Sequence, residues 1–440
     1  MRVKLAKRAM AVASAGALTA SLGAATPALA APVPTVQVPC STGALSSAIS
    51  GASSGDVLRL ASSCTYTLDT ALPDVTTPLT LQGGTNTTLE RSYASGTPDF
   101  SLLYVGAAGN LTVTNVNFKN GYSSYQGGAI FAAGGPLSVT GGTFTGNYSP
   151  GYGGAIDSED GLTLTGATFT DNSALYYGGA ISANGTPTTI SDSTFTRNST
   201  GDTGDGGALI TFADTTVANS SFTGNDADYG GAVYVDGGAT TVDRGAFTKN
   251  SAEYGGGIYN DSYLNVNTGY FKQNTAESYG GGIYADGDMI LNKTTFTSNN
   301  GGQYGGGVYN EDAATVTDAT FTGNTAGDGG GWLNEDSVTM TGGSFTGNTA
   351  EDGGGLSNQY EATLSGTTFQ QNSASDAGGG LYEFGTFLTL NDSKVVYNHA
   401  PLGQGGGIYN ADTVNLATTV VRFNTKNNCS PALSVTGCAG

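Results

Sequence analysis

The stretch Tyr254–Asn274 reads Y-G-G-G-I-Y-N-D-S-Y-L-N-V-N-T-G-Y-F-K-Q-N and contains the unit that is repeated through most of the chain. A glycine block followed by an aliphatic residue opens the unit, and a Phe-x-x-Asn block closes it. The next copies begin at Tyr279 and Tyr304, so the local period is 25 residues. A fixed period of this size indicates a repeat architecture, in which each unit buries its apolar side only by stacking on its neighbours.

The spacing inside the unit is constant along the chain. An aliphatic residue or Met lies five positions before each closing Phe, and an Asn lies three positions after it. In the last two copies, Val395 and Val421 replace the Phe, and a degenerate copy without glycines lies near Leu102–Val105. The residues that follow the glycine block are Ile130, Ile156, Ile181, Leu209, Val233, Ile258, Ile283, Val308, Trp332, Leu356, Leu381 and Ile408.

These units are predicted to be short strands rather than helices. Residues alternate between apolar and polar with a period of two, as in Leu162–Leu164, and the chain contains 71 glycines. We therefore predict an all-β protein, a single right-handed parallel β-helix of about 13 coils with a period of 24–28 residues. Its core should contain ladders of Phe and aliphatic side chains. The repeated Asn is expected at a turn, where its side chain can satisfy backbone groups and it can tolerate an αL conformation, and stacked copies should form an amide ladder.

The first residues of the chain are expected to lie outside this fold. Four basic residues within the first eight positions precede an Ala-rich apolar segment, and Ala28–Ala30 matches an A-x-A cleavage signal. This pattern predicts a signal peptide over residues 1–30, and hence a secreted protein that is extracellular or associated with the cell surface. No second apolar run is long enough to span a bilayer, so no membrane insertion is expected. The Pro-rich residues 31–39 are predicted to be a flexible linker.

Residues 100–425 are assigned to the β-helix repeats, and the two flanking segments are predicted to be its caps. Residues 40–99 form the N-terminal cap and first coils, beginning with a short helix that places Leu45 and Ile49 on one face. Residues 426–440 form the C-terminal cap. Four cysteines in an exported chain predict disulfides, and local pairing is preferred among the three connectivities. The preferred pairs are Cys40 with Cys64 and Cys429 with Cys438.

The charge of the chain restricts its partners. Without the four basic residues of the signal peptide, 35 Asp and Glu face 11 Lys and Arg, which is a net charge of −24. Nucleic acids and anionic membrane surfaces are therefore not expected as partners, because phosphate groups are bound by Lys and Arg. The charge is compatible with neutral polymers or cations as ligands, and also with a role in solubility alone.

Two repeated motifs resemble a known group of proteins. Gly-Gly-Ala-Ile at 127–130, 153–156 and 178–181, with Phe-Thr-Gly-Asn at 144–147 and 222–225, is similar to the GGA(I/L/V) and FxxN repeats of polymorphic outer-membrane protein passenger domains. Those domains belong to the wider pectate-lyase-like β-helix group. The resemblance covers about residues 100–425, and it implies extracellular adhesion or surface display.

Two rows of tyrosines are the candidate ligand-binding residues. One tyrosine precedes the glycine block and the other follows the first aliphatic residue, so in four consecutive coils they would flank a strip of glycine. We expect this strip to form the floor of a groove that binds an extracellular polysaccharide or cell-surface polymer. The alternative is that the rings only stabilise the stack through contacts with one another. The candidate residues are Tyr229, Tyr234, Tyr254, Tyr259, Tyr279, Tyr284, Tyr304 and Tyr309.

Carboxylates border the same strip and suggest a cation site. Asp261, Asp286 and Glu311 occupy equivalent positions in consecutive coils, where close carboxylates repel unless they are solvated or share a cation. Calcium is the natural cation for such oxygen ligands, although no spacing matches a defined calcium loop. Calcium is therefore the cofactor that the sequence suggests, and solvated charge is the alternative.

Enzymatic activity is the second functional hypothesis. The resemblance suggests a polysaccharide lyase or hydrolase of the pectate-lyase-like group that depends on calcium, but no catalytic residue can be named from the sequence. Most Lys and Arg residues lie near the Phe-x-x-Asn segment rather than on the tyrosine strip, and His399 is the single histidine. A third hypothesis is ice binding through the Thr residues that flank many of the buried Phe residues, although such Thr residues are also ordinary for an exposed strand.

Overall fold

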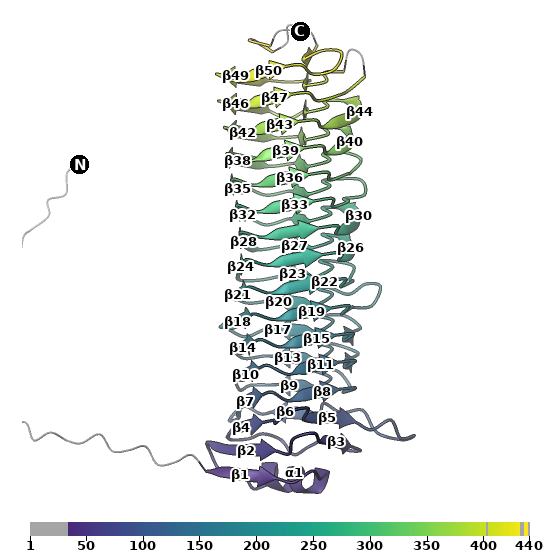
Figure 1. Cartoon of the computed structure of the whole chain (residues 1–440), viewed down its shortest axis with the longest axis vertical. Helices are drawn as coiled ribbons and strands as arrows, with labels where there is room; N and C mark the ends of the chain where they lie inside the picture. Colours follow the sequence, from purple (N-terminus) through teal and green to yellow (C-terminus); the bar gives the residue numbers. More distant parts are fainter. Residues whose placement is uncertain (1–33, 402–403, 432–434, 439–440) are drawn as a thin grey trace, which may run out of the picture. The chain divides into compact units, whose positions relative to one another are not determined.

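A computed structural model describes residues 34–401, 404–431 and 435–438. The predicted signal peptide, its cleavage site and residues 31–33 lie outside this range. In the described part, the chain winds through short parallel strands that align from coil to coil, which produces three long sheets named sheets I, II and III (Figure 1). This arrangement confirms the predicted parallel β-helix.

Sheet I is made of the strands that precede each Phe-x-x-Asn segment, together with strands from the N-terminal cap. It contains 16 strands, all parallel. In order, they are β1 (Thr35–Val38), β2 (Asp56–Leu60), β4 (Pro78–Gln82), β7 (Asn110–Thr114), β10 (Leu137–Thr140), β14 (Leu162–Thr165), β18 (Thr188–Ser191), β21 (Thr215–Ala218), β24 (Ala239–Asp243), β28 (Tyr263–Asn267), β32 (Met289–Asn292), β35 (Ala314–Thr317), β38 (Ser337–Thr341), β42 (Glu361–Ser365), β46 (Phe387–Asn391) and β49 (Val414–Ala417).

Sheet II contains 15 strands, most of which carry the closing Phe at their centre. They are β3 (Thr65–Leu68), β5 (Thr88–Arg91), β8 (Asn117–Lys119), β11 (Thr143–Thr145), β15 (Thr168–Thr170), β19 (Thr194–Thr196), β22 (Ser221–Thr223), β25 (Ala246–Thr248), β29 (Tyr270–Lys272), β33 (Thr295–Thr297), β36 (Thr320–Thr322), β39 (Ser344–Thr346), β43 (Thr368–Gln370), β47 (Lys394–Val396) and β50 (Val420–Arg422).

Sheet III contains 14 strands, most of which follow the glycine block. They are β6 (Leu103–Val105), β9 (Ile130–Ala132), β13 (Ile156–Ser158), β17 (Ile181–Ala183), β20 (Leu209–Thr211), β23 (Val233–Val235), β27 (Ile258–Asn260), β31 (Ile283–Ala285), β34 (Val308–Asn310), β37 (Trp332–Asn334), β41 (Leu356–Asn358), β45 (Leu381–Glu383), β48 (Ile408–Asn410) and β51 (Cys429–Ser430). Three two-stranded ribbons lie in the connections between sheets II and III. They are β12 (Tyr148–Ser149) with β16 (Ser173–Ala174), β26 (Ser251–Tyr254) with β30 (Thr275–Tyr279), and β40 (Thr349–Asp352) with β44 (Ser373–Ala377).

The in-register pairing turns each repeated residue into a ladder. Phe247 pairs with Phe271, and Phe271 pairs with Phe296. Their ring centroids lie 4.6 and 4.9 Å apart, the rings are nearly parallel, and all three side chains are fully buried. Ring stacking at this distance follows from the spacing of about 4.8 Å between neighbouring strands. The predicted Phe ladder is confirmed.

The repeated Asn forms the predicted amide ladder, but it does not adopt the αL conformation. Asn250 donates from Nδ2 to Asn274 Oδ1 at 2.9 Å and to the carbonyl of Phe222 at 3.1 Å, and its backbone N–H also donates to Asn274 Oδ1. The αL residue is the one before the Asn, as at Lys249 with φ 56° and Gln273 with φ 54°. The Asn side chain must point into the turn to reach the next coil, so the preceding residue makes the bend.

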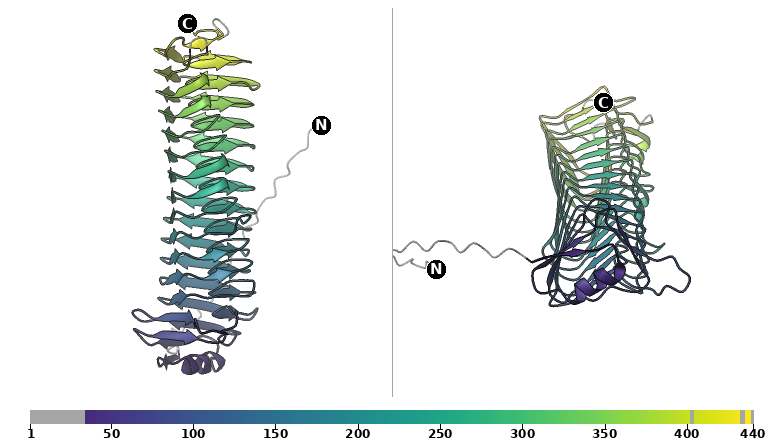
Figure 2. Two further views of the ribbon diagram at one scale, coloured as in Figure 1. Left: turned by 90° about the vertical axis from the view of Figure 1, so that its right-hand side faces the viewer. Right: turned by 60° about the horizontal axis from the view of Figure 1, so that its bottom comes forward.

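Both caps contain the predicted elements. Helix α1 (Thr42–Ser50) covers the N-terminal end of the coils and buries Leu45 and Ile49 against them (Figure 2). Disulfides join Cys40 with Cys64 and Cys429 with Cys438, as preferred from the sequence. The flexible-linker prediction is wrong for residues 35–38, which form β1 and pair with β2. Because β1, β2 and β4 join sheet I, the stack has more coils than the 13 predicted from the repeats.

Candidate functional site

The predicted tyrosines lie together on the outer face of sheet III, but in two layers. We call Tyr229, Tyr254, Tyr279 and Tyr304 the outer tyrosine row, and Tyr234, Tyr259, Tyr284 and Tyr309 the inner tyrosine row. The inner row lies on strands β23, β27, β31 and β34, and the outer row packs over it. The ring of Tyr229 contacts the ring of Tyr259 edge to face at 5.1 Å, and the rings of Tyr279 and Tyr309 lie 5.0 Å apart.

Most of the inner row is not available to a ligand. Tyr259, Tyr284 and Tyr309 are only 7, 8 and 3% exposed, while Tyr234 and the whole outer row are half-buried. The rings and the neighbouring Leu333 form a small apolar cluster outside the main core. The expected side-by-side arrangement of two exposed rows is therefore wrong, and only the outer row and Tyr234 remain as ligand-binding candidates.

The glycine strip is not the floor of a groove, because it is buried. A Cβ atom on Gly256 would lie 2.5 Å from the carbonyl oxygen of Thr275 in the next coil, and one on Gly257 would lie 3.0 Å from the Phe271 ring. Gly255 has φ +66°, a conformation that residues with a Cβ rarely adopt. The glycines are thus required for the close packing of successive coils.

The outer tyrosine row presents ring edges and hydroxyl groups rather than ring faces. Tyr229 and Tyr254 are stacked with centroids 4.8 Å apart, Tyr254 and Tyr279 at 5.5 Å, and Tyr279 and Tyr304 at 5.1 Å. Each ring face inside the row is therefore covered by the next ring along the stack. A sugar ring has no free aromatic face to stack on between these coils, and contact with a ligand has to go through the edges and hydroxyls.

Carboxylates beside the rows accept hydrogen bonds from the tyrosines. The hydroxyl of Tyr284 donates to Glu311 Oε1 at 2.6 Å, and that of Tyr309 donates to the same atom at 3.0 Å. Tyr234 and Tyr259 make longer contacts of 3.4 and 3.5 Å with Asp261 and Asp286. In the described part of the chain, no three Asp, Glu, His or Cys residues are grouped as a metal site. Asp261, Asp286 and Glu311, the predicted calcium ligands, each lie within 3.5 Å of a tyrosine hydroxyl.

Burial and nearby carboxylates raise the pKa of several of these tyrosine hydroxyls. A hydrogen bond with Glu253, with burial as the next cause, raises the pKa of Tyr254 to about 12. Burial and nearby carboxylates also raise the pKa of each inner-row hydroxyl. Burial, together with Glu311 and Asp261, raises the pKa of Asp286. At neutral pH, the surface therefore combines hydroxyl donors with carboxylate acceptors.

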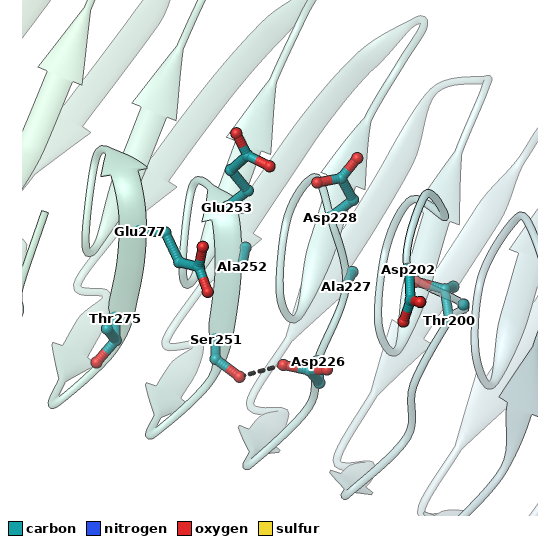
Figure 3. A pocket seen from close by; sticks show the side chains of 11 residues that line it. Thr200, Asp202, Asp226, Ala227, Asp228, Ser251, Ala252, Glu253, Thr275 and Glu277 are labelled. Atoms are coloured by element: carbon teal, nitrogen blue, oxygen red, sulfur yellow. Dashed lines mark hydrogen bonds between the residues drawn. The ribbon is translucent and has the colours of Figure 1, made fainter. Parts of the chain in front are cut away.

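An acidic groove runs beside the outer tyrosine row, in the connections between sheets II and III (Figure 3). It encloses about 300 Å³, and the hydroxyl of Ser251 donates to Asp226 within it. Its acidic lining residues are Asp202, Asp226, Asp228, Glu253 and Glu277. Asp228 and Glu253 directly precede tyrosines of the outer row, and Glu277 lies two positions before Tyr279. Asp202 and Asp226 were missed because they lie in the connections, although the changed length near 199–206 was a signal.

A second cleft, which we call the Asp157 cleft, lies nearer the N-terminal end of sheet III. It encloses about 310 Å³ and is lined by Tyr125, Gln126, Tyr152, Glu159 and Asn184. Tyr125 is 52% exposed, more than any member of the two tyrosine rows. No residue of this cleft was named as a site from the sequence. The available signal was the change of residue type on sheet III, where Asp157 and Ser182 replace apolar or tyrosine residues.

Asp157 is completely buried beside this cleft and is only partly hydrogen-bonded. Asn184 Nδ2 donates to its Oδ1 at 3.2 Å, and contacts with Ser182 and Gln126 also lower its pKa, while its Oδ2 has no donor within hydrogen-bonding distance among the described residues. Burial, with a smaller contribution from Glu159, raises the pKa of Asp157 to about 7. The amide nitrogen of Gln126 donates to Glu159 Oε1 at 2.9 Å and lies beside Asp157.

No curated protein sequence matches the chain. Among solved structures, it is similar to tailspike protein 3 of bacteriophage CBA120, with 14% sequence identity and a TM-score of 0.26. The match covers 89% of this chain but only 59% of the tailspike chain, and a likeness this low transfers no function. No helix of the described residues is long and apolar enough to cross a membrane.

The family profile that matches is described as the right-handed β-helix region. It covers residues 76–211 and 263–426, which is more than half of the chain and includes both tyrosine rows in part and the whole Asp157 cleft. The match agrees with the three parallel sheets, the stacked Phe rings and the amide ladder, and it confirms the predicted handedness. The chain belongs to the right-handed β-helix family.

Proposed function

We propose that this is a secreted protein that binds an extracellular polysaccharide or a similar hydroxyl-rich cell-surface polymer along the outer face of sheet III. Within the right-handed β-helix family, this makes it an adhesin-like or carbohydrate-binding protein, in line with its resemblance to polymorphic outer-membrane protein passenger domains. The signal-peptide pattern of residues 1–30 supports secretion.

The observation that carries this proposal is the outer tyrosine row with its flanking carboxylates. One tyrosine per coil extends over four consecutive coils, with acidic residues on both sides. Hydroxyl donors and carboxylate acceptors thus repeat about every 4.8 Å, the spacing of neighbouring strands. A chain of sugar hydroxyls can both donate to the carboxylates and accept from the tyrosines.

A polymer would gain affinity from repetition rather than from one strong contact. Each exposed hydrogen bond contributes little, because it replaces a bond to water. Several linked contacts act together, since after the first contact forms the others become intramolecular. The ligand is expected to lie along the stack axis and to be neutral or positively charged, because the surface is acidic.

The test removes hydroxyls without removing rings. The double variant Tyr254→Phe and Tyr279→Phe keeps the stacked rings but deletes two outward hydroxyls. We expect weaker retention on insoluble polysaccharides in affinity electrophoresis or pull-down assays, and an unchanged melting temperature. The matched control is Tyr263→Phe with Tyr270→Phe, two exposed tyrosines on sheets I and II of the same coil. Equal loss in both variants, or no loss in the first, would contradict the proposal.

Hydrolysis of the bound polymer is the second candidate function. Asp157 and Glu159 are neighbouring carboxyl groups, one buried with a raised pKa and the other lining the cleft, and acid–base hydrolysis uses two carboxyl groups in different environments. No Lys, Arg or His lines their cleft, which favours a hydrolase over a lyase. Hydrolysis would be established if the protein released reducing ends without unsaturated products and if the Asp157→Asn variant no longer released them. Unchanged polymer after incubation would leave binding alone.

A further inference from the structure

The Asp157 cleft breaks the pattern of sheet III at a cost to stability. Along the sheet, the position of Asp157 is paired with Phe131 in the preceding coil and Ser182 in the next. Two coils later, the same position is Ile210. Burying a carboxyl group with one unpartnered oxygen is unfavourable, and an apolar residue at this position would serve the fold better. A buried acid that the fold does not require points to a ligand.

The charges around the cleft indicate the kind of ligand. Glu159 supplies a second carboxylate. The residues that line the cleft include no Lys, Arg or His that could neutralise either acid. The rings of Tyr125 and Tyr152 meet edge to face at 5.6 Å and form one wall. An ammonium group fits this set of residues, because it donates up to three hydrogen bonds, compensates carboxylate charge and is attracted to aromatic faces.

The amide of Gln126 occupies the place that such a group would take. It donates to Glu159 Oε1 at 2.9 Å, and a contact between the same amide and Asp157 lowers the pKa of the Asp157 carboxyl group. An amide nitrogen is a neutral donor of the same size as an ammonium group. Asp157 itself does not line the cleft and is fully buried, so one cation reaches both carboxyl groups only if the side chain of Gln126 turns toward solvent.

We propose that the Asp157 cleft binds the ammonium group of an amino sugar, between Asp157, Glu159 and the Tyr125–Tyr152 wall. The polymer bound along sheet III is then a cationic amino polysaccharide. Only the claim that the ligand is a polymer rests on the proposed function, because the cleft itself would bind a short oligomer. The high negative charge of the chain favours the same class of ligand.

The test compares two oligomers that differ only in the charge of the amine. Glucosamine oligomers carry free ammonium groups, whereas N-acetylglucosamine oligomers of the same length carry neutral amides. By titration calorimetry at low salt, we expect the full-length secreted chain to prefer the glucosamine oligomer. Asp157→Asn should weaken this binding by a factor on the order of 30, as for the loss of one partner of a desolvated charge pair. Gln126→Ala should strengthen it, because the competing amide is gone.

The controls separate this site from general acidity. Asp392→Asn changes the net charge equally at an exposed turn between sheets I and II, and it should leave the affinity unchanged. Glu159→Gln is the second variant of the cleft, used if Asp157→Asn does not fold, and it should also weaken binding. Equal affinity for the two oligomers, or equal loss in Asp392→Asn, would overturn the inference.

The outcome also distinguishes this inference from the proposed function. If neutral polysaccharides are retained through the outer tyrosine row and the amine makes no difference, the binding function stands and the amino-sugar assignment fails. If the glucosamine oligomer binds in the cleft but no polymer is retained in a manner that depends on Tyr254 and Tyr279, the inference stands and the proposed function fails.

Discussion

At the scale of single residues, the side chains that stabilise this protein differ in their surroundings from those that we propose as ligand-binding. Phe247 and Asn250 are buried with all contacts satisfied by the neighbouring coils. Asp157 is buried without such satisfaction, and Glu383 is buried in the core with hydrogen bonds from Asn358 and Gly385. The hydrogen bonds of Glu383 explain its place in the fold, whereas those of Asp157 do not.

Replacing Phe247 with Ala should lower the free energy of unfolding by about 3–5 kcal/mol, because it removes one fully buried ring from the ladder. Chemical denaturation monitored by circular dichroism measures the loss. Tyr270→Ala provides the control, since Tyr270 is exposed on the same strand pair of sheet II and should change stability little. Similar effects in both variants would contradict the ladder as the source of stability.

The stability of the chain should fall as the pH rises from about 4 to about 7. Burial raises the pKa of Asp157 to about 7, from a value near 3.8 in the unfolded chain. In this range the native state therefore holds a proton that the unfolded state has lost. The free energy of unfolding decreases with each unit by which the pH rises. Asp157→Asn removes this contribution, so its melting temperature should rise relative to the wild type at pH 8, with little difference at pH 4. A difference that does not depend on pH would contradict the raised pKa.

At the scale of elements, sheet III carries a second apolar layer on its outer face. The glycine block forces adjacent coils close together, and the inner tyrosine row then lies beneath the outer row. Rings of the two rows meet edge to face, and so do neighbouring rings of the inner row. Such contacts stabilise the folded chain beyond the contribution of the apolar area that they bury. On the outer face of this sheet, the inner tyrosine row therefore serves the packing of the coils, and only the outer tyrosine row and Tyr234 are exposed enough to meet a ligand.

Removing an inner-row ring should destabilise the protein, in contrast to the outer-row Phe substitutions. Tyr284→Ala empties a buried site and leaves Glu311 without one of its donors. We expect a loss of about 3 kcal/mol or more, measured by chemical denaturation. Tyr279→Phe, which keeps its ring in the outer row, is the comparison and should be nearly neutral. Unchanged stability in Tyr284→Ala would mean that the inner row is not a packed layer.

At the scale of the whole molecule, the excess of acidic residues opposes folding through mutual repulsion. Rows of carboxylates recur from coil to coil along sheet III, and the described chain has only four ion pairs to offset them. Added salt screens this repulsion over distances of about 10 Å at 0.1 M ionic strength. The repulsion is general, because the acids are distributed along the stack rather than gathered at one point.

Raising the ionic strength with sodium chloride should therefore increase the melting temperature. Calcium and magnesium chloride at equal ionic strength should give equal increases, because the carboxylates of Asp261, Asp286 and Glu311 are arranged around tyrosine hydroxyls and not as a metal cage. Differential scanning fluorimetry with the three salts measures this. A larger increase with calcium than with magnesium would instead support the calcium site suggested by the sequence.

The architecture could be predicted from the sequence because it depends on local periodicity. The constant distances from aliphatic residue to Phe and from Phe to Asn determine the register of every coil, and the cysteine positions favoured the observed disulfides. The exposure of the tyrosines could not be predicted, because it depends on how closely the glycines let the next coil approach. Whether Tyr259 faces solvent or the ring of Tyr229 is decided by the third dimension.

The ligand-binding candidates show the same division. The β-helix, its ladders, its disulfides and the acidic border of the tyrosine strip follow from residue type and spacing, so they could be predicted from the amino acids alone. The burial of the inner tyrosine row, the closure of the glycine strip and the position of Asp157 beside a cleft with Tyr125 and Asn184 are visible only in three dimensions. The reason is that these features depend on contacts between coils about 25 residues apart, where small differences in side-chain size decide which groups remain exposed.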